Sequence, residues 1–178
     1  PSSKEYFKNG IVSGVKGAIV PGYYVLESGI AAVGDMFGWF VDHMVSEEYA
    51  EKAKAEGKNL HVYLTEKASE LKPGESGVVA LDWWNGNKTP YVDGRLSGVL
   101  VGCTLNTKPE EIYRALIEAT AFGTRKIVEM YKEANPDIRM IIASGGIAEK
   151  NPLFMQIYAD VLNCEIRLSA TYQTAALG

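Results

Sequence analysis

The pair of glycines between a predicted strand and a predicted helix is the feature of this sequence best suited to ligand chemistry. Gly145 and Gly146 follow the apolar run 138–143. Because glycine has no Cβ, the backbone there can approach a bulky ligand closely. Asn151-Pro152 then opens a helix as cap and first residue, and free N–H groups at a helix start suit a phosphate. The pattern predicts a nucleotide site or a plain turn, and both interpretations stay open.

A second unusual pattern is the group of glycines in a segment with helical spacing of apolar residues, 27–45. Gly29, Gly34 and Gly38 each cost up to ~1 kcal/mol relative to alanine inside a helix. Gly34 and Gly38 are four residues apart and therefore share a helix face. We expect either close helix packing or a ligand at that face.

The cysteines and histidines do not have the spacing of a metal site. Cys103 and Cys164 lie far apart, without a second cysteine or a histidine at ligand spacing, and His43 and His61 are isolated. No metal ligand is predicted in this chain. We interpret both cysteines as reduced and semi-buried, as in a cytoplasmic protein.

The elements that would position these residues alternate in the second half of the chain between strand and helix, which predicts an α/β layered fold. A long helix is expected over about 107–132, with Thr107 and Glu110 as a capping box and Phe122 on its inward face. The charged segment 46–71 is expected to form two short surface helices, a solvated face or an oligomer contact rather than a binding site. The other expected elements are an extended stretch over 11–26 with a turn at 19–22, strands at 77–81, 98–102, 138–143 and 165–168, and a helix over 151–163.

Composition excludes several classes of protein. The chain has 178 residues, 47% of them hydrophobic and 22% charged, and a net charge of −4. Such a chain is apolar enough to fold as one domain or slightly more. Its acidity argues against nucleic acid as a partner, and the absence of a long apolar run argues against a membrane. Because residues 175–178 look like the first turn of an interrupted helix, we expect a fragment of a longer protein.

Several motifs occur in the order found in one enzyme family. The run 144–160 resembles the nucleotide segment of the FGGY carbohydrate kinases, and the run from Gly98 to Glu118 resembles that family's second signature. Residues 81–87, together with 19–24 and Glu27, are similar to the branch of the family that phosphorylates L-ribulose.

The resemblance implies an α/β fold of the actin-like ATPase (ribonuclease H-like) kind, with a mixed sheet flanked by helices. Residues 1–178 would be the C-terminal kinase domain, truncated at both ends, with 46–76 as a surface helical insertion. The N-terminal kinase domain would be missing, and with it the aspartate base. No catalytic residue is therefore expected in this chain, and the fragment alone is expected to be inactive.

The resemblance also implies an activity. The chain would be the nucleotide-binding half of an ATP- and Mg²⁺-dependent cytoplasmic sugar kinase that phosphorylates the terminal hydroxyl of L-ribulose in L-arabinose catabolism. The alternatives are a sister kinase for xylulose, another ketose or glycerol, or a non-catalytic actin-like assembly module. A homodimer is a further expectation that remains open.

The resemblance assigns nucleotide roles to two groups of residues. Gly145 and Gly146 match the glycine pair that lies against phosphates and ribose. Asn151 matches an amide that reaches the adenosine, and its alternative role is that of a helix cap alone. Gly34, Phe37 and Gly38 match the helix face that borders the nucleotide.

Glu27 and the tryptophan pair at 83–84 each have two interpretations. Glu27 matches a position that faces the sugar, and its alternative role is charge compensation at a helix start. Trp83 and Trp84 would stack on a ligand or, in the interpretation we favour, pack as core and hinge residues.

Overall fold

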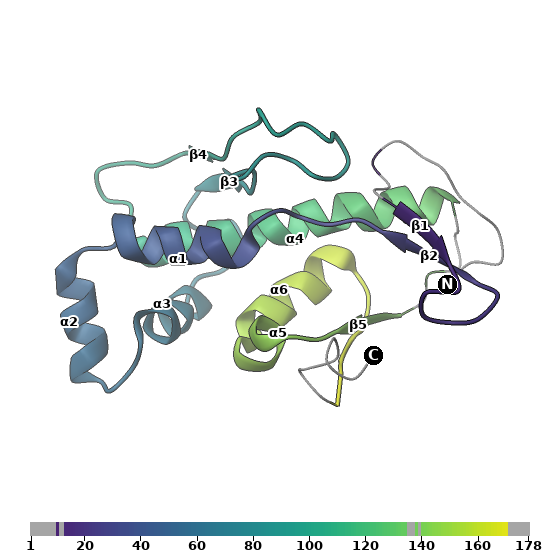
Figure 1. The fold of residues 1–178 in the computed structure, drawn as a ribbon. Helices are drawn as coiled ribbons and strands as arrows, with labels where there is room; N and C mark the ends of the chain where they lie inside the picture. Colours follow the sequence, from purple (N-terminus) through teal and green to yellow (C-terminus); the bar gives the residue numbers. More distant parts are fainter. Residues whose placement is uncertain (1–9, 11–12, 135–137, 139, 171–178) are drawn as a thin grey trace.

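The computed structural model describes residue 10, residues 13–134, residue 138 and residues 140–170 (Figure 1). Ala175 to Gly178 lie outside this part, so the expectation of an interrupted helix there stays a prediction. The elements in chain order are β1 (Ser13–Lys16), β2 (Tyr24–Glu27), α1 (Val33–Met44), α2 (Glu47–Ala55), α3 (Leu60–Ser69), β3 (Val79–Leu81), β4 (Val99–Val101), α4 (Pro109–Ala134), β5 (Ile141–Ala143), α5 (Gly146–Lys150), α6 (Pro152–Leu162) and β6 (Ile166–Leu168).

The first two strands form a hairpin. β1 pairs with β2 antiparallel, with Ser13 opposite Glu27 and Lys16 opposite Tyr24. The turn is held by backbone hydrogen bonds from Gly17 N to Tyr23 O and from Tyr23 N to Val20 O. The extended stretch and the turn predicted at 19–22 are confirmed for the described residues.

The helix predicted over 27–45 is shorter than its apolar spacing suggested. α1 begins at Val33, because Ala32 has a left-handed backbone with φ of 60°. Gly29 lies before the helix, where its backbone N–H donates to Thr89 Oγ1 at 3.3 Å. Glu27 therefore ends a strand instead of starting a helix, and its charge-compensation role is wrong.

The charged segment does form two helices, α2 and α3, but the prediction of a merely solvated surface is wrong for α3. Tyr63, Leu64 and Ala68 are buried in the core. Arg114, which is 8% exposed, donates from Nη1 to the carbonyl oxygens of Ala68 and Leu71 at 3.0 and 2.8 Å. These bonds satisfy backbone carbonyls at the α3 end, so α3 is anchored to α4.

The long helix α4 separates two layers (Figure 1). The β3–β4 hairpin lies on one side of it, and α3 and α6 lie on the other. The capping box predicted for this helix does not form: Thr107 Oγ1 accepts from Thr104 N, and Glu110 accepts from the Tyr49 hydroxyl. Phe122 is 56% exposed, so its predicted inward position is wrong. No helix within the described ranges is both long enough and apolar enough to cross a membrane.

The C-terminal part has the expected strand–helix–strand order. β5 pairs in parallel with β6, with Ile141 opposite Ile166 and Ala143 opposite Leu168. Between them, α6 begins after Asn151, which accepts from Phe154 N as the N-cap. The short helix α5 precedes α6, in a segment for which no helix was predicted. Parallel pairing through connecting helices is typical of α/β proteins, and the C-terminal part has this organisation. The described strands pair as three two-stranded sheets, of which β5–β6 is parallel and the other two are antiparallel.

Candidate functional site

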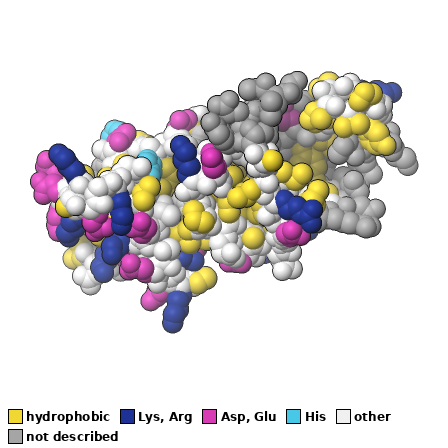
Figure 2. Space-filling model, turned by 90° about the horizontal axis from the view of Figure 1, so that it is seen from below, with side chains coloured by type: hydrophobic (Ala, Val, Ile, Leu, Met, Phe, Trp, Pro, Cys, Tyr) yellow, Lys and Arg dark blue, Asp and Glu magenta, His cyan; other side chains and the backbone are white. Residues whose placement is uncertain are grey.

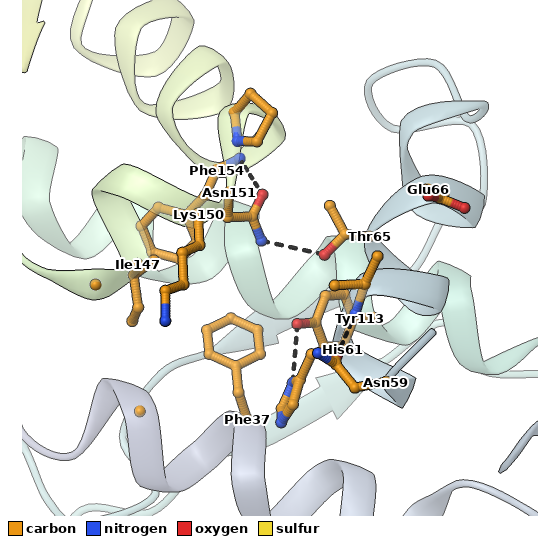
Figure 3. Close-up of a pocket in the computed structure, with 14 residues that line it drawn as sticks. Phe37, Asn59, His61, Thr65, Glu66, Tyr113, Ile147, Lys150, Asn151 and Phe154 are labelled. Atoms are coloured by element: carbon orange, nitrogen blue, oxygen red, sulfur yellow. Dashed lines mark hydrogen bonds between the residues drawn. The ribbon is translucent and has the colours of Figure 1, made fainter. Parts of the chain in front are cut away.

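A cavity of about 680 Å³ lies among α1, α3, α4 and the α5–α6 corner (Figure 3). Its size falls in the range of small-molecule sites. α1 contributes Gly34 and Phe37, and α4 contributes Tyr113. α3 and its cap contribute Asn59, His61, Val62, Thr65 and Glu66; the α5–α6 corner contributes Gly146, Ile147, Lys150, Asn151, Pro152 and Phe154.

The floor of the cavity is aromatic and buried. Phe37, Tyr113 and Phe154 are 6%, 3% and 5% exposed. The Phe37 ring lies 5.2 Å from the Tyr113 ring and 6.1 Å from the Phe154 ring, centroid to centroid. Phe154 in turn stacks on Tyr158 at 4.5 Å. A flat apolar ligand would find a rigid surface here, because aromatic rings packed in this way have little freedom to move.

Two glycines leave open space along the cavity wall. A Cβ added at Gly34 or at Gly146 would meet no atom within 4 Å. Close helix packing, one of the two expected reasons for a glycine at position 34, is therefore absent among the described residues. Both positions could carry a side chain in the protein as it stands, and the space they leave belongs to the cavity.

Asn151 holds its carboxamide in a fixed orientation (Figure 3). Its Oδ1 accepts from Phe154 N at 2.9 Å, and its Nδ2 donates to Thr65 Oγ1 at 3.1 Å. The oxygen thus caps α6 while the nitrogen faces α3. The helix-cap role predicted for Asn151 is confirmed, and the amide still has one N–H and one lone pair beyond these two bonds.

Two titratable rings meet where α3 packs against α4 at the edge of the floor. His61 Nδ1 lies 3.2 Å from the Tyr113 hydroxyl. Partial burial lowers the pKa of His61, with a smaller opposing effect from Asp42. Burial raises the pKa of Tyr113, so its hydroxyl stays protonated at neutral pH. The imidazole is therefore mainly neutral at neutral pH and presents a polar but uncharged edge.

The charges of this face lie toward one end of the molecule. Figure 2 shows Lys, Arg, Asp and Glu side chains gathered over the α2–α3 end and hydrophobic side chains along the middle. At the cavity rim, Lys150 brings a positive charge, while Glu66 is paired with Lys58. A negatively charged group extending from a ligand on the aromatic floor would meet Lys150 near the α5–α6 corner.

The structure brings together some of the residues predicted from the sequence. Gly34, Phe37, Gly146 and Asn151 all line the cavity. Gly145 immediately precedes Gly146, with φ of 97°, a conformation that favours glycine. Gly38 is not among the lining residues, although a Cβ there would also meet no atom within 4 Å.

The predicted sugar-facing residue lies apart from this cavity. Glu27 is exposed at the end of β2, and its Oε1 pairs with Lys88 Nζ at 3.1 Å. Over the described residues, no three His, Cys, Asp or Glu side chains are grouped so as to hold a metal ion. Cys103 is exposed and Cys164 half-buried, and both are free thiols, so the semi-buried prediction holds for Cys164 alone.

The wall that sequence reasoning missed is α3. The segment 46–71 was expected to face solvent, yet Asn59, His61 and Thr65 line the cavity. The available signal was the pattern of Tyr63, Leu64 and Ala68, which places apolar residues on one face of α3.

The comparisons with known proteins decide the family. The chain matches the family model "FGGY family of carbohydrate kinases, C-terminal domain" over residues 2–178. The chain belongs to the FGGY family of carbohydrate kinases. Among FGGY relatives, it is 54% identical to a ribulokinase of Halalkalibacterium halodurans over 175 residues, which cover 98% of this chain and 31% of the relative. It is 52% identical to a ribulokinase of Bacillus licheniformis, covering 95% of this chain and 31% of the relative. The chain thus spans about a third of the length of these FGGY proteins.

Solved structures of a glycerol kinase and a xylulose kinase share the fold. A Plasmodium falciparum glycerol kinase with ADP matches with a TM-score of 0.69 at 22% identity, over 86% of this chain and 28% of that one. A xylulose kinase from Rhodospirillum rubrum matches with a TM-score of 0.64 at 25% identity, over 89% and 32%. The predicted α/β fold of the actin-like kind is confirmed.

Proposed function

We propose that this chain is the nucleotide-binding half of an ATP-dependent sugar kinase that phosphorylates the terminal hydroxyl of L-ribulose. The observation that carries the nucleotide part is the cavity in which Gly34 and Gly146 leave open space above a buried aromatic floor. The similarity to proteins named ribulokinase supports the sugar. Residues 1–178 would be the C-terminal domain, truncated at both ends, with 46–76 inserted at its surface.

The cavity suits an adenine nucleotide in size and chemistry. The base would lie on the floor formed by Phe37, Tyr113 and Phe154, where burial of its faces provides most of the binding energy. The unused donor and acceptor of Asn151 would contact the adenosine. Gly34, and at a greater distance Gly38, would leave room for it on α1.

The phosphates would lie toward Gly145 and Gly146. The first N–H groups of α5 have no partners within that helix, and glycine allows the ligand to approach them. Lys150 would add a positive charge at the same corner. Mg²⁺ would be held mainly by the ATP phosphates and water, because the described residues hold no acidic cluster for it.

Catalysis would then depend on positioning. Phosphoryl transfer requires alignment and charge neutralisation more than covalent help from the protein. This half would hold the nucleotide and exclude water from it, while the N-terminal kinase domain would supply the aspartate base and most of the sugar site. Glu27 would accept hydrogen bonds from sugar hydroxyls, with its ion pair to Lys88 holding the carboxylate in place.

The free cysteines and the surface of α2 bear on the compartment and the oligomeric state of the enzyme. The free thiols Cys103 and Cys164 fit a reducing compartment, and we propose a cytoplasmic protein of L-arabinose catabolism. A homodimer remains a prediction, with the exposed charged surface of α2 as its candidate contact.

A substrate panel on the full-length protein tests the sugar. ADP release is measured with MgATP and saturating L-ribulose, xylulose or glycerol. We expect the highest kcat/KM with L-ribulose. A higher kcat/KM with xylulose or glycerol would identify the protein as a sister kinase for that substrate. The 178-residue chain alone should release no ADP in response to sugar, and sugar-dependent release by it would contradict the proposed division of labour.

A further inference from the structure

The outer face of the β3–β4 hairpin carries four exposed aliphatic side chains. These are Val79, Leu81, Val99 and Val101, which are 64%, 39%, 39% and 60% exposed. The register places Val79 opposite Val101 and Leu81 opposite Val99, so all four share one sheet face. We call these four side chains the outer patch.

The inner face of the same hairpin is covered. Val78 and Ala80 are 4% and 8% exposed, and α4 packs against β3 on that side. α1, α3 and α6 pack on α4 in turn, with α3 and α6 on its opposite side (Figure 1). Within the ranges that the structure describes, the helices therefore cover the inner face and leave the outer patch open.

A sheet face made only of aliphatic side chains is unusual where the sheet faces solvent. Strands with one wet face alternate apolar and polar residues, whereas strands buried on both faces are apolar throughout. β3 and β4 read Val-Ala-Leu and Val-Leu-Val, without a polar residue. Their sequences are those of strands buried on both sides. The second edge of β3 also has no partner strand in the described part of the chain.

The partner that fits is part of the same polypeptide. The two ribulokinases compared above are about three times as long as this chain, so most of such a protein lies outside residues 1–178. A second copy fits less well, because a stable dimer interface takes about 20–30 residues a side and the outer patch offers four. We propose that a helix from outside residues 1–178 of the same polypeptide packs its apolar stripe onto the outer patch.

A helix is the element that fits a sheet face. β3 and β4 form an antiparallel pair whose inner face packs against the helix α4, and a second helix would cover the apolar outer face in the same way. The contact would bury the cross-strand pairs Val79–Val101 and Leu81–Val99 and complete an α/β/α layer order. It would also tie this domain to the remaining polypeptide independently of any ligand in the cavity.

Thiol accessibility in the full-length protein tests the proposal. Val79→Cys and the control Arg95→Cys are made separately with Cys103 and Cys164 replaced by serine. Arg95, in the loop between β3 and β4, has 91% of its side chain exposed. The rate of maleimide modification is followed by the mass of the modified peptide. We expect Val79→Cys to react about 100-fold more slowly than the control, because a covered thiol reacts only after local opening.

Two outcomes would overturn the proposal. Equal rates at the two positions would show that the outer patch faces solvent in the full-length protein. Protection of Val79→Cys that disappears on dilution to the monomer would identify a second copy as the cover. As an independent check, Val79→Asp should lower the Tm of the full-length protein by several degrees if the patch is buried. An unchanged Tm would count against the proposal.

Discussion

Asn151 and Thr65, 86 positions apart in the sequence, are joined by a hydrogen bond of 3.1 Å across the cavity. The bond runs from Asn151 Nδ2 to Thr65 Oγ1, while Asn151 Oδ1 caps α6 through Phe154 N. If the amide turned over, Nδ2 would face the N–H of Phe154 and the cap bond would be lost, whereas the Thr65 hydroxyl could still donate to Oδ1. The cap therefore fixes which donor and acceptor Asn151 presents to a ligand, and Thr65 holds the amide from the α3 side.

Removing the Thr65 hydroxyl should weaken ATP binding with little effect on chemistry. In Thr65→Val, Asn151 Nδ2 loses its acceptor and the amide gains freedom. A neutral hydrogen bond contributes about 0.5–1.5 kcal/mol, which corresponds to roughly 2- to 12-fold in KM for ATP. Steady-state kinetics of the full-length enzyme should show this rise with kcat nearly unchanged.

Thr65→Ser is the matched control, because it keeps the oxygen that accepts from Asn151. Its KM for ATP should stay near that of the unmodified enzyme. A KM for Thr65→Val equal to that of Thr65→Ser would show that the Thr65–Asn151 bond has no part in nucleotide binding.

Substitutions at Asn151 separate its cap role from its contact with a ligand. Asn151→Asp keeps an oxygen for Phe154 N but removes the amide donor, whereas Asn151→Ala removes both. We expect Asn151→Ala to lose about 1 kcal/mol of stability and Asn151→Asp much less. Calorimetric titration with MgADP should show weaker binding in both variants. Normal affinity in a folded Asn151→Asp protein would leave Asn151 with its cap role alone.

Gly98 is close to the Trp84 ring, and the structure predicts a packing role for both residues. A Cβ at Gly98 would overlap that ring, whereas one at Gly94 would meet no atom within 4 Å. Gly98→Ala should therefore cost about 1–3 kcal/mol through overpacking. Thermal unfolding should place its Tm several degrees below that of Gly94→Ala. Equal Tm values would mean that the Trp84 ring moves aside at no cost.

Asp82 is a buried carboxyl whose charge should destabilise the protein at neutral pH. It is 6% exposed, and burial raises its pKa above the ordinary value of an aspartate. The folded state thus holds the proton more tightly, so stability falls as pH rises from the ordinary carboxyl pKa through the raised one. Asp82→Asn should raise the Tm at pH 7, and the gain should shrink as the pH falls toward 4.

Asp93 provides a control of opposite sign. Its hydrogen bonds with Arg95 lower the pKa of Asp93, so the stabilisation it gives is present at neutral pH and lost in acid. Asp93→Asn should leave the Tm at pH 7 unchanged or slightly lower. A Tm gain in Asp93→Asn as large as that in Asp82→Asn would show that burial of Asp82 is not the cause.

Local sequence signals predicted the features that depend on near neighbours. The Asn151 cap, the break between α2 and α3, and the strand–helix order after Pro109 all follow from residues a few positions apart. The glycine spacing also singled out the part of α1 that borders the cavity. Gly34 lowers the stability of the helix relative to alanine, and no close packing at Gly34 compensates for that loss.

The features that failed depend on distant residues. The late start of α1 accompanies a bond between Gly29 and Thr89, 60 positions away. The core position of α3 depends on hydrogen bonds from Arg114 in α4. Glu110 does not cap its helix as predicted, because it accepts a hydrogen bond from Tyr49, 61 positions away. A periodic pattern shows which face of a helix is apolar but not which element covers it. For that reason the sequence could indicate the apolar face of α3, but the cavity wall that α3 forms and the contact of Thr65 required the structure.

The most direct test of the nucleotide site compares Gly34→Ala with Gly38→Ala in the full-length protein. Both substitutions lie in α1, both have open space for a Cβ, and alanine should stabilise the helix in each by about 0.5–1 kcal/mol. Only Gly34 lines the cavity. We expect calorimetric titration with MgADP to show at least about a tenfold loss of affinity in Gly34→Ala, the loss that ~1.4 kcal/mol of steric cost gives, and little change in Gly38→Ala. Unchanged affinity in a stable Gly34→Ala protein would contradict the assignment of this cavity to the nucleotide.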